Sequence, residues 1–164
     1  MAFANTSSFT ASDANNMLRG LHRDNTTYST QAVAETDLAS YTLTGGTMGA
    51  TGALHIQAAG TTTTATDTKR IRLYFGGTAI IDTTAVTGTS DWWMDAWVYN
   101  TSASAQRIVV QWSTHNSATN YNKDYTTLAI DTASNQIIKV TGILANAADT
   151  ISQTVFDIFV VQIA

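Results

Sequence analysis

Hydrophobic and polar residues alternate along much of this chain, and the stretch Asp91–Tyr99 departs from that alternation. Successive side chains of a β-strand point to opposite faces. A strand at the surface of a monomer alternates apolar with polar residues, whereas this stretch is largely apolar on both faces. We therefore predict that the outer face of this strand is also covered, either by a second layer of the same chain or by another subunit. One face carries Trp92, Met94, Ala96 and Val98, predicted to lie in the core, and the other carries Trp93, Trp97 and Tyr99 with Asp91 and Asp95.

Short apolar or alternating segments separated by turn residues predict the other strands. Gly76-Gly77 follows Phe75 and predicts a two-residue hairpin, because both glycines accept a positive φ. Many short strands without a long helical segment predict an all-β domain, an antiparallel β-sandwich of the jelly-roll type. The segments predicted as strands are 38–44, 53–59, 69–75, 78–83, 91–99, 106–114, 125–131, 136–144 and 153–163.

Two more segments, 137–144 and 154–163, carry apolar residues on both faces. A large aromatic side chain can bury roughly 150–250 Å², so the outer aromatic residues together exceed the apolar patch of roughly 300–600 Å² that is normal for a monomer. The N-terminal segment could cover part of this surface, but a symmetric homo-oligomer covers it more completely. The residues assigned to the subunit interface are Trp93, Trp97, Tyr99, Phe159 and Val161.

Residues 1–37 have a different pattern. An extended polar segment leads to Ser12, a residue type that caps helices, and apolar residues at helical spacing then predict a short helix of two or three turns. This region either docks onto a partner or caps one end of the sandwich, and we expect docking. Residues 1–37 are therefore predicted to be an attachment arm and residues 38–164 the sandwich domain. The attachment contacts are assigned to Phe3, Phe9, Met17, Leu18 and Leu21.

Composition narrows the classes of partner. The formal net charge is −4, which does not favour nucleic acid as a partner because a nucleic-acid binder needs a clustered basic face. The chain has no cysteine, which excludes disulfides and zinc–thiolate sites. No stretch approaches the roughly 18 apolar residues of a membrane-spanning helix, and the first residues lack the features of a signal peptide. We therefore expect synthesis in a cytoplasm and no membrane insertion.

Catalytic chemistry requires titratable groups that converge on one site. His22, His55 and His115 are scattered over the predicted elements, and no Gly-x-Ser-x-Gly motif presents a nucleophile. Asp91 and Asp95 share a strand face, but nothing else supports glycosidase chemistry. No His-x-x-x-His or acidic Ca²⁺-loop pattern occurs. We expect neither enzymatic activity nor a metal or cofactor.

The stretch 115–125 combines amide side chains with tyrosines, the residue types that suit sugar hydroxyls and sugar rings. A solvated loop at the tip of the sandwich is the simpler interpretation, and a contact with a host surface glycan is the alternative. The residues that would make this contact are Asn120, Tyr121 and Tyr125.

Five segments resemble small β-sandwich proteins of tailed-bacteriophage particles: Tyr41–Leu43, Gly52–Ile56, Lys69–Gly77, Ser104–Arg107 and Phe156–Val160. The resemblance spans about residues 38–164. It implies a jelly-roll or tumour-necrosis-factor-like fold, a homotrimer, and a place in the virion as a capsid decoration (cement) protein or head fibre, or as the tip of a tail fibre or needle. The expected partners are other copies of the chain and a capsid or other virion protein. The motifs are structural, so the resemblance implies no binding residue.

Overall fold

The computed structural model describes residues 18–161, apart from 64–65, 84–86, 89–90 and 116–118, and the side chains of 119–121 lie outside the description. In the described residues the chain forms strands and no helix. The strands are β1 (Leu18–Asp24), β2 (Tyr28–Thr30), β3 (Thr36–Leu43), β4 (Ala53–Thr62), β5 (Lys69–Phe75), β6 (Thr78–Asp82), β7 (Asp91–Ser102), β8 (Ala105–His115), β9 (Thr119–Leu128), β10 (Gln136–Leu144) and β11 (Ile151–Val161).

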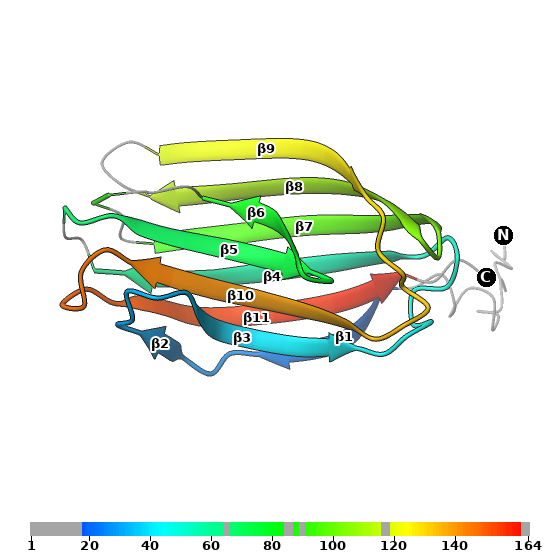
Figure 1. The fold of residues 1–164 in the computed structure, drawn as a ribbon, viewed down its shortest axis with the longest axis horizontal. Helices are drawn as coiled ribbons and strands as arrows, with labels where there is room; N and C mark the ends of the chain where they lie inside the picture. The colour runs from blue at the N-terminus through cyan, green and yellow to red at the C-terminus, as the bar shows by residue number, and fades with distance from the viewer. Residues whose placement is uncertain (1–17, 64–65, 84–86, 89–90, 116–118, 162–164) are drawn as a thin grey trace, which may run out of the picture.

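The strands form two antiparallel sheets that pack face to face (Figure 1). The larger sheet has the order β1-β11-β4-β7-β8-β9, with β2 also paired to β11, and the smaller has the order β3-β10-β5-β6. The chain passes between the sheets from β2 to β3, β3 to β4, β4 to β5, β6 to β7, β9 to β10 and β10 to β11. These crossings build the jelly-roll type of sandwich, so the predicted fold class is confirmed.

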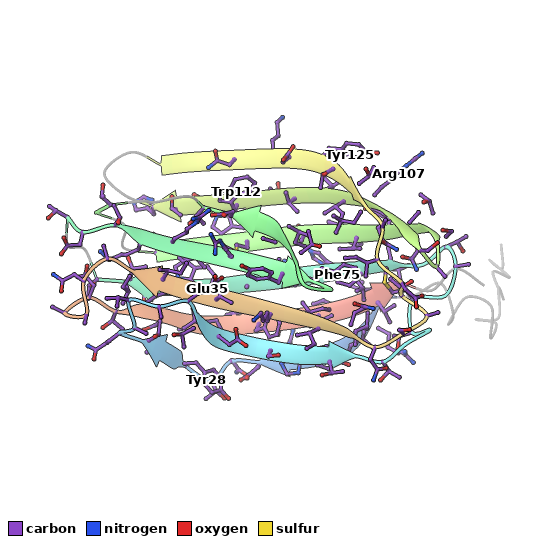
Figure 2. All side chains as sticks on the ribbon, in the orientation of Figure 1. Tyr28, Glu35, Phe75, Arg107, Trp112 and Tyr125 are labelled. Atoms are coloured by element: carbon purple, nitrogen blue, oxygen red, sulfur yellow. The ribbon has the colours of Figure 1, made fainter. Side chains whose placement is uncertain are left out.

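The core lies between the sheets and contains the inward-facing half of each alternating strand. Trp92, Met94 and Val98 of β7 are buried in it, as the alternation predicts. Phe75 at the end of β5, labelled in Figure 2, is fully buried. The next residues, Gly76 and Gly77, have φ of 54° and 81°, which is the conformation of the predicted two-residue hairpin.

The prediction of a helix after Ser12 is wrong for Leu18 to Leu21, the part of that segment that the structure describes. Residues 12–17 lie outside the described residues, and Leu18 to Leu21 belong to strand β1, which pairs with β11. Pairing along the exposed edge of β11 satisfies a full row of backbone groups, whereas a helix here would hold Gly20 in its interior at a cost of about 1 kcal/mol. The helical spacing of the leucines was therefore coincidental.

The described part of the predicted arm is integral to the sandwich. Both β1 and β2, which precede residue 38, pair with β11 in the larger sheet, and β3 begins at Thr36 in the smaller one. Attachment through residues 1–37 remains a prediction. Of the predicted arm, the segment before Leu18 lies outside the described residues.

The stretch 115–125 is also different from the expected loop. Residues 119–125 lie in β9, which forms a hairpin with β8 and is the edge strand of the larger sheet. Figure 1 shows β9 beyond β6, the edge of the smaller sheet. Since no strand of the smaller sheet lies opposite its first part, Asn122–Tyr125 of β9 are exposed on both faces and do not need the apolar alternation that identifies most strands, whereas Leu128 at its end packs against the core.

Candidate interaction surface

One row of residues crosses the outer face of the larger sheet from edge to edge. Strand register places each member directly opposite the next on the neighbouring strand, so their side chains share this face. We call it the outer row. From β9 to β1 its members are Tyr125, Val109, Trp97, His55, Phe159 and Gly20.

Aromatic rings in the middle of the outer row stack on one another. The rings of His55 and Trp97 are nearly parallel, with centroids 4.2 Å apart and an interplanar angle of 9°. Tyr99, two residues along β7, is parallel to Trp97 at 5.8 Å. Phe159 lies 6.1 Å from His55 on the other side. Because the rings cover one another, less apolar area is exposed than the full ring areas in the sequence estimate suggest.

A hydrogen-bonded carboxylate holds this stack in place. Nε2 of His55 donates to Oδ2 of Asp95 over 2.7 Å, and Nε2 of Gln57 donates to the same oxygen over 3.2 Å. Burial raises the pKa of Asp95, but the hydrogen bonds from His55, Gln57 and Gln111 outweigh burial, so the net pKa lies below its ordinary value. Asp95 therefore stays ionised at neutral pH and fixes the plane of the His55 ring against Trp97.

The outer face of this sheet concentrates the exposed apolar side chains of the molecule. Of the seven large hydrophobic residues exposed in the described part of the chain, four lie on this face, each at least 41 % exposed. Two of them, Leu18 on β1 and Tyr99 on β7, flank the outer row, and Val109 and Tyr125 belong to it. Tyr125 projects at the β9 edge in Figure 2. This face therefore offers an apolar surface that spans the whole width of the sheet.

The structure places all five residues assigned to the interface from the sequence on one face of the larger sheet, with the polar row Asp157, Gln57 and Asp95 between Trp93 and Trp97. Trp93, Trp97 and Tyr99 lie on the outer side of β7, and Phe159 and Val161 lie on the outer side of β11. Tyr99 is exposed and the other four are half-buried. Their role in an interface remains a prediction, but their common position on one face is now established.

Sequence reasoning missed two contributors to this surface, His55 and Val109; it placed Asp95 on this face but did not predict its hydrogen bond with His55. His55 was considered only as a possible catalytic residue, although its place between the apolar residues Leu54 and Ile56 of an alternating strand predicts that it points outward. Val109 lies in the predicted strand 106–114, but no residue of that strand was assigned to the interface. The contact between His55 and Asp95 joins two strands and had no local signal.

The residues assigned to attachment have different positions. Phe3, Phe9 and Met17 lie outside the described residues. Leu18 is exposed beside Val161 on the outer face, and Leu21 is partly buried against the core. Leu21 therefore contributes to packing within the sandwich. Leu18 is the more accessible of these two residues to a partner.

Among the residues assigned to a glycan contact, Tyr125 is 59 % exposed on β9. The side chains of Asn120 and Tyr121 lie outside the described residues, although their backbones pair with β8. The structure therefore places one of the three side chains, and it lies on the outer row.

The histidines and aspartates considered for catalysis do not form one site. His22 packs against Tyr41 and Phe156 at centroid distances of 5.0 and 5.4 Å, whereas His55 belongs to the ring stack. His115 lies opposite Asp91, at the far end of β7 from Tyr99. Within the described residues, no group of three or more metal-ligating side chains occurs. The same part of the chain has no helix of the length and hydropathy needed to cross a membrane.

Comparison with known proteins adds only distant likenesses. No protein-family model matches the chain, and no curated protein matches it significantly. Lectin II from Ulex europaeus is similar in structure with a TM-score of 0.40 and 8 % identity, over 88 % of this chain and 92 % of the lectin. A structure described as lectin UEA-II complexed with galactose gives a TM-score of 0.41 and 8 % identity, over 90 % and 93 % of the two chains. The fold and the surface thus define a jelly-roll sandwich with an apolar outer face, and the function is argued from this chain's own residues.

Proposed function

We propose that this protein is a non-enzymatic structural protein of a bacteriophage particle, made in the host cytoplasm and incorporated into the virion. It forms a homotrimer through the outer face of the larger sheet and acts as a capsid decoration protein or head fibre. The proposed trimer rests on the continuous outer row, which has apolar residues from the β9 edge to the ring stack and Phe159. The virion part rests on the resemblance of residues 38–164 to phage β-sandwich proteins.

The properties of the outer face support assembly rather than simple solvent exposure. Its centre is a stack of rings, and polar groups such as Gln57 and the Arg23–Asp157 ion pair border the stack. An apolar centre with a polar border is the arrangement found in protein–protein interfaces. If the outer faces of three copies turn toward the threefold axis, the two neighbouring copies cover the face of each subunit.

Attachment to the particle is assigned to the segment before Leu18. A deletion of residues 1–17 leaves β1 and β2 in place, so the truncated chain is expected to fold and to keep the same oligomeric state. It should fail to bind purified phage capsids that lack this protein, whereas the full chain should bind them in a cosedimentation assay. Phe3→Ala and Phe9→Ala variants test the two aromatic anchors separately. Full capsid binding by the truncated chain would contradict the attachment role.

A second candidate function is a receptor-binding module at the tip of a tail fibre or needle. The observation that favours it is the exposed Tyr125 on the solvated edge strand β9. In that case binding to a glycan array or to host cells should disappear in Tyr125→Ala and Tyr121→Ala variants. An array without signal, together with capsid binding, would favour the structural role.

A further inference from the structure

The outer face of the smaller sheet carries a groove of about 480 Å³, on the side of the sandwich opposite the outer row. This volume falls within the range of small-molecule sites, roughly 300–1,000 Å³. Strands β3, β5 and β10 form its floor and the glycine turn after β5 forms one rim. The residues that line it are Asp37, Ser40, Tyr74, Gly76, Gly77, Asn135, Gln136, Ile137 and Lys139.

The floor of the groove combines an apolar and a polar part. Ser40, Lys139 and Tyr74 form one cross-strand row, and Ile137 lies two residues before Lys139 on the same face. The Ile137 side chain is 51 % exposed, which is unusual for an isoleucine on a central strand. The Ser40 hydroxyl has no hydrogen-bond partner among the described residues. An apolar contact and a free hydroxyl thus lie on adjacent rows.

Neighbouring contacts fix the polar walls. Asn135 Oδ1 accepts the backbone N–H of Gly45 over 2.9 Å, which leaves its Nδ2 group as a donor. Gln136 donates through Nε2 to the carbonyl of Asp131 over 2.6 Å, which leaves Oε1 as an acceptor. A Cβ at Gly76 would lie 2.7 Å from that Oε1, so glycine keeps the space beside the amide open. The walls therefore offer both donors and acceptors.

The charges in the groove are balanced. Nζ of Lys139 lies 2.7 Å from Oδ1 of Asp37 and 5.5 Å from the centroid of the Tyr74 ring. The hydroxyl of Tyr74 donates to Glu35, which also pairs with Arg72. Each cation beside the groove is thus matched by a carboxylate. A charged ligand would lack a counter-charge here, so the groove favours a neutral one.

The position of the groove argues against a peptide that adds as a strand. Strand addition needs an unpaired sheet edge, whereas β10 and β5 are paired on both sides at this point. The ligand must instead present several groups that both donate and accept hydrogen bonds, and an apolar face for Ile137. Hydroxyl groups on a ring of CH groups meet both requirements. The geometry points to a neutral saccharide, bound through one or two sugar units, as the ligand of this groove.

The test uses the full chain with ¹³C-labelled isoleucine δ1 methyl groups, titrated with single sugars. The probes are the methyl pyranosides of glucose, galactose, mannose and N-acetylglucosamine, with N-acetylneuraminic acid as the acidic comparison. At least one neutral sugar should shift the Ile137 methyl signal saturably. The Ile143 methyl signal, from the same strand but outside the groove, should not move. An Ile137→Val variant assigns the signal.

A substitution that fills the groove tests whether the Ile137 shift comes from sugar bound in the groove or from sugar bound elsewhere on the protein. Ser40→Tyr places a ring across the polar row and should raise the dissociation constant at least about tenfold, equivalent to roughly 1.4 kcal/mol. Ser29→Tyr, an exposed serine of the larger sheet, is the matched control and should leave binding unchanged. The proposal is overturned if no neutral sugar shifts Ile137, if Ser40→Tyr leaves the shift intact, or if only the acidic sugar binds.

This inference is independent of the proposed oligomer, because the groove and the outer row lie on opposite faces. A monomeric protein that binds sugar through Ile137 would contradict the trimer and support the groove. A trimer without the Ile137 shift would contradict the groove alone.

Discussion

Replacing Val109 by lysine tests the assignment of the outer face most directly. Val109 lies in the outer row between Trp97 and Tyr125, and its side chain is 45 % exposed in the single chain. Full burial of a valine side chain is worth about 1.5–3 kcal/mol, so burying the remaining part in an interface contributes about 0.7–1.4 kcal/mol per copy. In the Val109→Lys variant the interface loses this contribution, and assembly must also remove the lysine charge from water.

In a trimer the loss occurs in each of the three copies. The total is about 2–4 kcal/mol before the charge is considered, which raises the trimer dissociation constant roughly 30- to 900-fold. Folding of the single chain should change by no more than about 0.5 kcal/mol, because the residue is a surface position there. We therefore expect a folded Val109→Lys variant that dissociates at concentrations where the parent protein stays assembled.

Sedimentation velocity and light scattering measure this effect over a concentration series. The parent protein should have about three times the 17.5 kDa mass of the chain. Ile137→Lys is the matched control, since Ile137 is 51 % exposed on the opposite sheet, and it should remain assembled. The reasoning is refuted if the parent protein is a monomer at every concentration, or if Ile137→Lys dissociates and Val109→Lys does not.

Three further predictions concern stability, each measured by denaturant unfolding. Because hydrogen bonds lower the pKa of Asp95 below 3.8 in the folded state, its contribution is present above that pH and lost as the pH falls. Asp95→Asn should cost about 1–3 kcal/mol at pH 7 and should weaken the loss of stability between about pH 5 and pH 2; an unchanged acid profile would contradict this. Gly76→Ala should cost about 1–2 kcal/mol or more, because of its positive φ and its crowded Cβ position, whereas Gly77→Asn, with open space around it, should cost less; equal effects would show that crowding does not matter. Gln153 is fully buried and its amide has no hydrogen-bond partner among the described residues, so Gln153→Met should stabilise the fold by about 1–2 kcal/mol; a loss of stability would mean that the amide is satisfied in solution.

The alternation of apolar residues was sufficient to predict the inner and outer faces of the central strands. It placed Trp92, Met94 and Val98 in the core and Trp93, Trp97 and Tyr99 on the opposite face, because a period of two is a property of the strand itself. The Gly76-Gly77 turn was predictable for a similar reason, since its φ values depend only on local backbone sterics.

The edges of the larger sheet could not be predicted in this way. β1 has leucines at helical spacing and a glycine, and the part of β9 before Tyr125 is mostly polar, so neither shows the pattern of a half-buried strand; only the end of β9 falls within the predicted strand 125–131. Both are strands because a neighbouring strand of the sheet, β11 for β1 and β8 for β9, offers a row of unpaired backbone groups. Such pairing depends on residues more than a hundred positions away in the case of β1.

The sequence by itself determined the fold class, the core face of each central strand and the unusual apolar character of the outer residues. Only the tertiary structure decided which of those outer residues are neighbours. Strand order and register bring His55 from β4 between Trp97 of β7 and Phe159 of β11, and they place Asp95 to hold it. The physical reason is that periodicity sets the direction of a side chain within its own strand, whereas the contacts across strands follow from backbone pairing between distant segments.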